Sequence, residues 1–192
     1  MKLCLFGGSF DPVHSGHLTI AEAAVQHCGL DKIVFLPAAE SPFKQGKRHL
    51  FTDAQRLELL RLTTAPLPWA EVSELDLQLP PPSWSWRLAE HYRSNFPEAE
   101  LFWLLGTDQW QELHRWGRYD YLIKTLHFIV YHRGEAPEQR EGVRSTFIAG
   151  HHPASATDIR RILQNAAPLP DGWMPPATEL RAREMMRERE AR

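Results

Sequence analysis

Apolar and polar positions along this chain predict strands and helices that alternate. Short continuous apolar runs are typical of strands buried on both faces of a sheet. Stretches with helical spacing separate these runs, and this order favours a parallel sheet with right-handed crossovers. The predicted strands are Lys2–Phe6, Lys32–Leu36, Ala70–Leu75, Leu101–Leu105, Leu126–His132 and Thr146–Ile148. The predicted helices are Leu18–His27, Asp53–Ala65, Trp84–Asn95, Gln109–Leu113, Tyr119–Lys124 and Thr157–Asn165.

Local signals mark some helix starts and the connections between elements. Thr52 followed by Gln55 predicts a capping box for the second helix, and Ser83 is the expected N-cap of the third. The connection 37–51 is long and basic, whereas 134–142 is polar and 167–176 is rich in proline. Because 179–192 is densely charged, we expect a solvated helix with a frayed end there.

Length and charge narrow the class of protein. A chain of 192 residues suits one domain, here expected over 1–176, followed by a charged helix or tail over 177–192. The formal net charge of −2 argues against a general nucleic-acid binder. Cys4 and Cys28 form no ligand-type cluster, so we expect reduced thiols in a cytoplasmic protein. We expect neither a signal peptide nor a membrane span, because no apolar run approaches about 18 residues.

The most specific motif follows the first predicted strand. A turn containing Gly7, Gly8, Ser9 and Phe10 leads into a helix, and this arrangement suits phosphate binding, because backbone N–H groups can approach a ligand closely. His14 and His17 are three residues apart, so we expect them to share one face of the helix start. A metal site is the alternative for this pair, although no cluster with metal-ligand spacing accompanies it.

The run Gly7-Gly8-Ser9-Phe10-Asp11-Pro12-Val13-His14-Ser15-Gly16-His17 resembles the N-terminal signature of nicotinate-mononucleotide adenylyltransferases, in the H-x-G-H nucleotidyltransferase superfamily. The resemblance extends from residue 1 to about 176. It implies a Rossmann-like doubly wound α/β fold in a single domain. It also implies transfer of AMP from ATP to nicotinate mononucleotide in NAD biosynthesis, giving nicotinate adenine dinucleotide and pyrophosphate, with Mg²⁺ accompanying ATP. A pyridine mononucleotide and ATP would be the ligands of a protein that could also form a homo-oligomer.

The chemistry that this resemblance implies fits the rest of the sequence. There is no P-loop motif, and local patterns indicate neither a Ser-His-Asp nor a Cys-His arrangement. A phosphate monoester is already ionised near neutral pH, so its attack on the α-phosphorus of ATP needs no general base. Catalysis then rests on positioning and on neutralising charge, and His14 and His17 are the first candidates for that role.

Later motifs also resemble the family. Lys44, in Ser41-Pro42-Phe43-Lys44, stands where the family has a phosphate-binding lysine, although its usual neighbouring histidine is Phe43 here. Gly106 and Asp108 follow the fourth predicted strand and match the family's G-x-D, which implies nucleotide contacts. An N-cap of the next helix is the alternative role for Asp108.

Two further segments concern the pyridine ring and the triphosphate. The resemblance implies that Trp116 stacks on the ring, unless it is a packing residue, and that Ser85 helps to recognise the ring carboxylate. Ser155, Thr157 and Arg160 resemble a Ser/Thr-rich helix start that binds triphosphate, the alternative being a simple capped helix with a surface arginine.

Departures from the family pattern keep other functions open. Phe43, Trp84 and Ala156 replace the family's histidine, tyrosine and serine. They allow adenylyl transfer to another phosphomonoester, such as nicotinamide mononucleotide or phosphopantetheine, or a paralogue that binds nucleotides without turnover. A class I tRNA synthetase shares the histidine motif, but this chain is too short for one.

Overall fold

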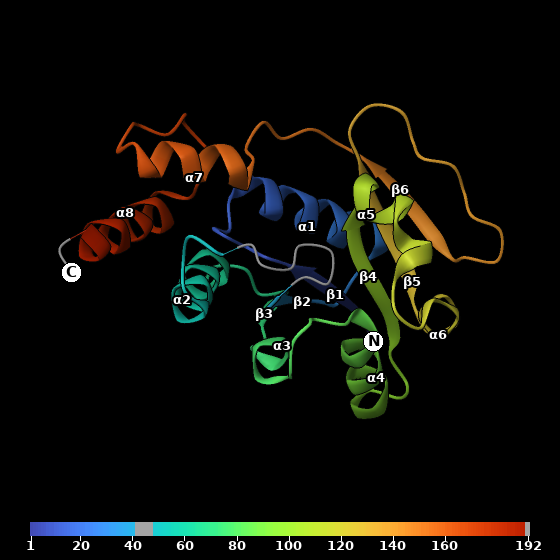
Figure 1. The fold of residues 1–192 in the computed structure, drawn as a ribbon. Helices are drawn as coiled ribbons and strands as arrows, with labels where there is room; N and C mark the ends of the chain where they lie inside the picture. The colour runs from blue at the N-terminus through green and yellow to red at the C-terminus, as the bar shows by residue number, and fades with distance from the viewer. Residues whose placement is uncertain (41–47, 191–192) are drawn as a thin grey trace.

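A six-stranded, all-parallel sheet forms the centre of the molecule in the computed structural model, which describes residues 1–40 and 48–190 (Figure 1). The strand order is β3-β2-β1-β4-β5-β6. The predicted α/β architecture, Rossmann-like and in one domain, is confirmed. The strands are β1 (Lys2–Gly8), β2 (Lys32–Pro37), β3 (Ala70–Val72), β4 (Glu100–Gly106), β5 (His127–His132) and β6 (Ser145–Ala149).

The sheet is doubly wound, and alternate residues of each strand enter different cores. In β1, Cys4 and Phe6 pack among α1, α2, α7 and α8, whereas Leu3 and Leu5 pack among α4, α5 and α6. Figure 1 shows α1 and α7 on one side of the sheet and α4 on the other. The helices are α1 (Ser15–Cys28), α2 (Asp53–Thr64), α3 (Leu75–Gln78), α4 (Ser85–Asn95), α5 (Thr107–Gln111), η1 (Leu113–Arg115), α6 (Tyr119–Thr125), α7 (Ala156–Gln164) and α8 (Pro176–Glu190).

The strand order reverses at β1 and β4, and this reversal positions the site. β1 pairs with β2 on one edge and with β4 on the other. The connections that leave β1 and β4 therefore diverge to opposite faces and open a crevice at the carboxyl ends of the strands. Gly7 and Gly8 end β1 and Gly106 ends β4, so both predicted turns lie at this crevice.

Several predicted boundaries differ from the structure. The third strand ends at Val72 instead of Leu75, because Leu75 begins the short helix α3. α1 begins at Ser15 instead of Leu18, since His14 is its N-cap. α5 begins at Thr107, directly after β4, and the predicted helix Gln109–Leu113 is divided between α5 and η1.

One of the two predicted helix caps is confirmed. Thr52 and Gln55 form the reciprocal capping box at the start of α2. The N-cap of α4 is Trp84 and not Ser83. The Ser83 hydroxyl instead accepts the backbone N–H of Glu40 at 3.1 Å, so it joins the segment after β2 to the segment before α4.

Helix α8 packs as part of the core, so the expectation of a solvated tail is wrong for its inner face. Ala182 and Met185 are buried in the same apolar cluster as α1, α2 and α7. The hydroxyls of Thr63 and Thr178 lie 2.8 Å apart and link α2 to α8. Small and apolar side chains, spaced among the charged ones, form this face. The charged composition of the segment does not indicate it. The boundary at residue 176 stays a prediction.

Among the helices of the described ranges, none is long and apolar enough to cross a membrane.

Removing the Met185 side chain tests whether α8 belongs to the core. We expect Met185→Ala to lower the free energy of unfolding by about 2–4 kcal/mol, because it leaves a cavity under the helix. Leu180→Ala, which changes an exposed residue of the same helix, is the matched control and should stay within about 0.5 kcal/mol of wild type. Urea unfolding measures both variants. Equal, small effects would show that α8 contributes little to folding.

Candidate functional site

The turn after β1 folds back on itself around Phe10. Phe10 has a φ of 43°, an unfavourable value for a non-glycine residue. Its buried ring lies over Gly8, where a Cβ would come within 3.2 Å of the ring. The ring also meets Phe6 edge-on, at 5.3 Å between centroids. Packing of Phe10 thus holds a strained backbone in place, and the absence of a side chain at Gly8 makes room for it.

The two histidines of the motif lie together at the start of α1. The His14 backbone N–H donates to Nδ1 of His17 at 3.2 Å, and the two ring centroids are 3.8 Å apart. A Cβ on Gly16 would lie 2.9 Å from the His14 ring and 3.3 Å from the Ala154 carbonyl oxygen. The absence of a side chain at Gly16 therefore makes room for the His14 ring at the helix start.

Both imidazoles are neutral at physiological pH. Burial lowers the pKa of His14 to about 2, with smaller contributions from His17, His152 and Arg133. Burial also lowers the pKa of His17 to about 4. Because Nδ1 of His17 accepts a hydrogen bond, the proton of its neutral ring is on Nε2. His17 is thus a neutral N–H donor, whose protonation a bound anion would favour.

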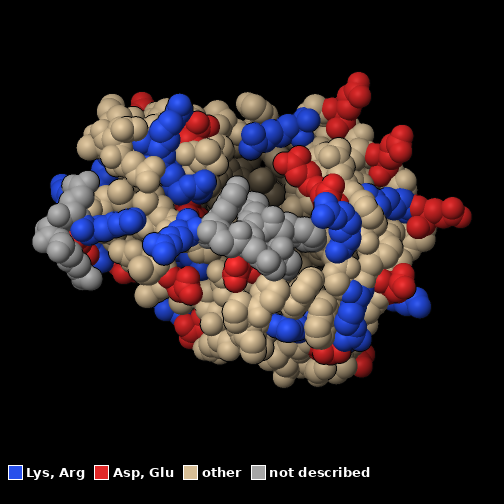
Figure 2. Space-filling view, in the orientation of Figure 1, with Lys and Arg blue, Asp and Glu red and all other residues tan. Residues whose placement is uncertain are grey.

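A cavity of about 820 Å³ lies at the crevice and joins many of the predicted site residues. Figure 2 shows a hollow with basic side chains above it and acidic ones to its right. Both predicted glycine turns and both predicted ring-binding residues line the cavity. The predicted residues that line it are Gly7, Gly8, Ser9, Phe10, His17, Ser85, Gly106, Asp108 and Trp116.

Other predicted residues lie beside this cavity instead of lining it. His14 is buried against the His17 ring. Arg160 reaches from α7 to the turn, where its Nη1 donates to the Asp11 carbonyl oxygen at 2.7 Å, and its Nη2 donates to the Thr157 hydroxyl at 3.1 Å. Lys44 lies outside the described residues.

Ser155 caps α7, in agreement with the simpler interpretation of that motif. Its hydroxyl accepts the Asp158 N–H at 3.1 Å and donates to the Asp158 carboxylate at 2.7 Å. The Asp108 alternative is wrong, because Gly106 is the N-cap of α5. The exposed Asp108 carboxylate is therefore not used for capping and lines the cavity.

Three tryptophans form an aromatic wall in the cavity: Trp84, Trp103 and Trp116. Trp116 meets Trp103 edge-on, with centroids 5.7 Å apart and planes at 80°. Trp84 packs over Gly117, where a Cβ would lie 2.9 Å from its ring. Trp116 is 9% exposed, so packing and ring binding are both compatible with its position.

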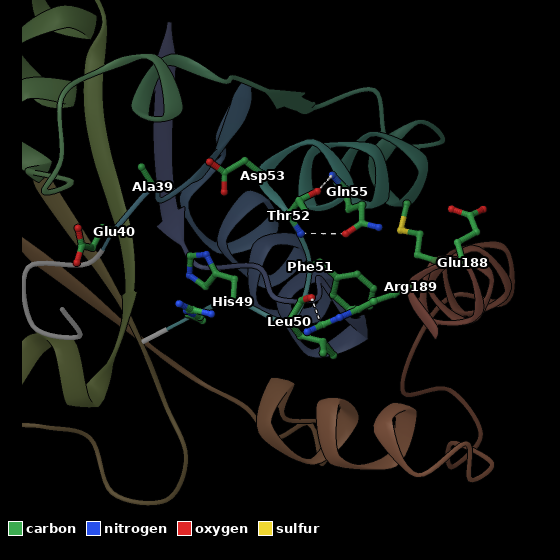
Figure 3. Close-up of a pocket in the computed structure, with 12 residues that line it drawn as sticks. Ala39, Glu40, His49, Leu50, Phe51, Thr52, Asp53, Gln55, Glu188 and Arg189 are labelled. Carbon is green, nitrogen blue, oxygen red and sulfur yellow. Dashed lines mark hydrogen bonds between the residues drawn. The ribbon is translucent and has the colours of Figure 1, made fainter. Parts of the chain in front are cut away.

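A second cavity, of about 850 Å³, lies between the segment before α2 and the end of α8. Figure 3 shows His49 and Asp53 on one side of it and Glu188 and Arg189 on the other. Arg189 donates to the Leu50 carbonyl oxygen at 3.1 Å, so the end of α8 is tied to this segment (Figure 3). Both acidic and basic side chains line the cavity, and none of the glycine-turn residues does.

Sequence reasoning missed three residues that shape the site. The exposed Arg133 lines the cavity directly after β5, and a cation at the carboxyl end of a buried strand was the available signal. The Asp11 carboxylate accepts the N–H groups of Leu50 and Phe51 at 2.8 and 2.9 Å. Arg56, on α2, is fully buried, and no local sequence signal marked it.

Among residues 1–40 and 48–190, no three His, Cys, Asp or Glu side chains are grouped to hold a metal ion. The two cysteines are free in the structure, and Cys4 is buried.

A family model described as cytidylyltransferase-like matches residues 5–162. The chain belongs to this family. A relative from Methylacidiphilum infernorum, named a probable nicotinate-nucleotide adenylyltransferase, is 37% identical over 88% of this chain and 83% of its own length. A relative from Bacteroides thetaiotaomicron with the same name is 32% identical over 85% and 82% of the two chains. As a member of this family, the protein is a nucleotidyltransferase.

Solved structures share the fold of this family member at low sequence identity. The Plasmodium falciparum nicotinic acid mononucleotide adenylyltransferase complexed with NaAD has a TM-score of 0.77 at 16% identity, covering 96% of this chain and 95% of its own. A putative nicotinate-nucleotide adenylyltransferase from Vibrio parahaemolyticus has a TM-score of 0.71 at 16% identity, covering 99% and 97%. These likenesses confirm the fold.

The low pKa values of the histidines predict a loss of stability in acid. Below pH about 6.5, His14 becomes protonated in the unfolded chain but stays neutral in the folded protein. The free energy of unfolding therefore falls as pH falls. At pH 5.5 the loss from His14 should be about 1.4 kcal/mol, one unit below the unfolded pKa. Between pH 7.5 and 5.5, we expect the free energy of unfolding to fall by about 1.4 kcal/mol less in His14→Gln than in wild type.

Urea unfolding at the two pH values measures the difference. His114→Gln, which changes an exposed histidine of η1, controls for the substitution itself. The same pH dependence in wild type and His14→Gln would contradict a neutral, buried His14.

Proposed function

We propose that this protein transfers AMP from ATP to nicotinate mononucleotide, giving nicotinate adenine dinucleotide and pyrophosphate. The observation that carries the proposal is a single cavity lined both by the glycine turn with His17 and by the aromatic wall. The turn suits phosphates, and the tryptophans suit a flat heterocycle. The names of the relatives support the same reaction.

The proposed chemistry uses the phosphate-binding residues as positioning and charge-neutralising groups. A phosphate oxygen of the mononucleotide attacks the α-phosphorus of ATP, and the bond to the β-phosphate breaks as pyrophosphate leaves. His17, a neutral N–H donor, and the cationic Arg133 both line the cavity where these oxygens would lie. Arg160 contacts the turn through the Asp11 carbonyl oxygen. Lys44 is proposed to add a further positive charge. Such donors stabilise charge that develops in the transition state.

The first turn of α1 contributes less to phosphate binding than a helix start with unpaired N–H groups would. The Ser15 N–H already donates to the Trp173 carbonyl oxygen at 2.9 Å, and the His14 N–H is bonded to His17. We therefore assign the phosphate contacts mainly to the turn and the side chains. Ser155 and Thr157 are proposed to contact the triphosphate through the start of α7, where Arg160 is held.

Mg²⁺ would enter with ATP, held chiefly by phosphate oxygens and water. Asp76, Asp108 and Glu112 are the carboxylates among the described residues that line the cavity, and they do not form a metal-binding group. This donor set fits an ion that arrives on the triphosphate and neutralises part of its charge. Asp108 is proposed to accept hydrogen bonds from ribose hydroxyls.

The aromatic wall favours a pyridine ring over the flexible chain of phosphopantetheine. Trp116 is proposed to stack on the ring, with Ser85 at the start of α4 contacting the ring carboxylate. Transfer to nicotinamide mononucleotide is the second candidate, because the ring faces the same tryptophans in either case. A cytoplasmic location and a homo-oligomeric state stay predictions.

Pyrophosphate release from ATP with a panel of phosphomonoesters tests the proposal. The panel contains nicotinate mononucleotide, nicotinamide mononucleotide and phosphopantetheine. We expect kcat/KM to be about ten- to a hundredfold higher for the acid than for the amide, since an acceptor-only carboxylate satisfies a site built from donors. Equal values would overturn the preference for the acid, and no release with any acceptor would favour a nucleotide-binding paralogue.

Replacing His17 tests its place in this reaction. We expect His17→Ala to lower kcat by about 10²–10³, because it removes a donor that acts on transition-state charge. Thermal melting with and without ATP verifies that the variant is folded. A rate within a few-fold of wild type in a folded variant would remove His17 from the catalytic residues.

A further inference from the structure

Two residues that line the cavity carry a buried polar atom without a hydrogen-bond partner. Within the described part of the chain, four buried side-chain nitrogen or oxygen atoms have none: His14 Nδ1, Arg56 Nε, Trp103 Nε1 and Tyr131 Oη. Trp103 and Tyr131 line the cavity. Buried donors are nearly always paired in native proteins, so an unpaired donor at a binding cavity points to a ligand as its partner.

Trp103 lines the cavity next to Trp116, the residue proposed to stack on the pyridine ring. It projects from the middle of β4 and is 3% exposed. A Cβ on Gly7 would lie 3.0 Å from its Cζ2 and 3.9 Å from Cε2, the carbon bonded to Nε1. The six-membered ring of the indole thus lies next to Gly7, which lines the cavity, and the indole meets the Trp116 ring edge-on. The side chain that carries the unpaired N–H therefore contacts both the phosphate turn and the residue proposed to stack on the ring.

The unpaired N–H is not a general property of buried tryptophans in this protein. Trp110, which is 2% exposed and does not line the cavity, donates its indole N–H to the Glu138 carbonyl oxygen at 3.1 Å. Phenylalanine would fill the apolar position in β4 without bringing a donor. The tryptophan therefore brings a buried polar group into the site at a cost that a bound acceptor would offset.

We propose that the Trp103 indole N–H donates a hydrogen bond to the exocyclic acceptor of the pyridine ring and favours a ring carboxylate over a ring carboxamide. This inference rests on the proposed function. A hydrogen bond to a carboxylate is charge-assisted and roughly twice as strong as one to a neutral carbonyl. That difference contributes to discrimination between the two mononucleotides. Trp103 is thus a specificity-determining residue of the aromatic wall.

The Trp103→Phe variant tests the donor while it keeps an aromatic ring in the core. The measured quantity is the ratio of kcat/KM for nicotinate mononucleotide to kcat/KM for nicotinamide mononucleotide. We expect this ratio to fall about tenfold in Trp103→Phe. Trp110→Phe is the matched control, because it removes an indole N–H that has a protein partner outside the cavity, and it should leave the ratio unchanged. An unchanged ratio in Trp103→Phe overturns the inference.

A second measurement on the wild-type protein does not depend on turnover or on folding of the variant. In protein labelled with ¹⁵N-tryptophan, saturating nicotinate mononucleotide should move the Trp103 indole proton resonance downfield, as expected for a new hydrogen bond, and should leave that of Trp110 in place. Binding that leaves the Trp103 resonance unmoved overturns the inference. If wild type releases pyrophosphate with no mononucleotide, the proposed function fails, and the titration still decides whether Trp103 binds the ring acid.

Discussion

The buried guanidinium of Arg56 holds together the two turns on which the candidate site depends. Its Nη1 donates to the Ser9 carbonyl oxygen at 2.5 Å, after β1, and its Nη2 donates to the Ala38 carbonyl oxygen at 2.9 Å, after β2. The partner carboxylate, Asp53, lies one turn earlier on α2, at 2.7 Å. A fully buried charge is stable only when it is paired and hydrogen-bonded, so α2 cannot move without disturbing both turns.

Further interactions extend this constraint across the molecule. The carboxylate of Asp11 fixes the segment before α2 through the N–H groups of Leu50 and Phe51. The backbone carbonyl oxygen of Asp11 accepts a hydrogen bond from Arg160 of α7. Helix α8 packs on α2 and reaches the same segment through its last turn. Elements from both halves of the chain therefore converge on residues 8–14. Contacts within the protein hold the glycine turn in shape, and such preorganisation lowers the cost of binding.

Much of the fold and part of the site follow from local sequence. Buried parallel strands read as apolar runs, and the turn that follows β1 lies at the switch point for topological reasons, so Gly8 and Gly106 were predictable as cavity residues. The buried role of Arg56 was not predictable, because only long-range packing distinguishes it from an exposed helical arginine. The inner face of α8 was hidden for the same reason, and Ser83 was misassigned because its partner, Glu40, is distant in sequence.

Amide hydrogen exchange in the ligand-free protein tests most directly whether Arg56 holds the turn in shape. The His14 N–H, bonded to His17, reports on the turn, and the amides of β5 report on the sheet. We expect slow exchange at both places in wild type, and exchange in Arg56→Met that is faster by an order of magnitude or more at His14 while β5 stays slow. Equal His14 exchange in the two proteins would contradict a turn held by Arg56.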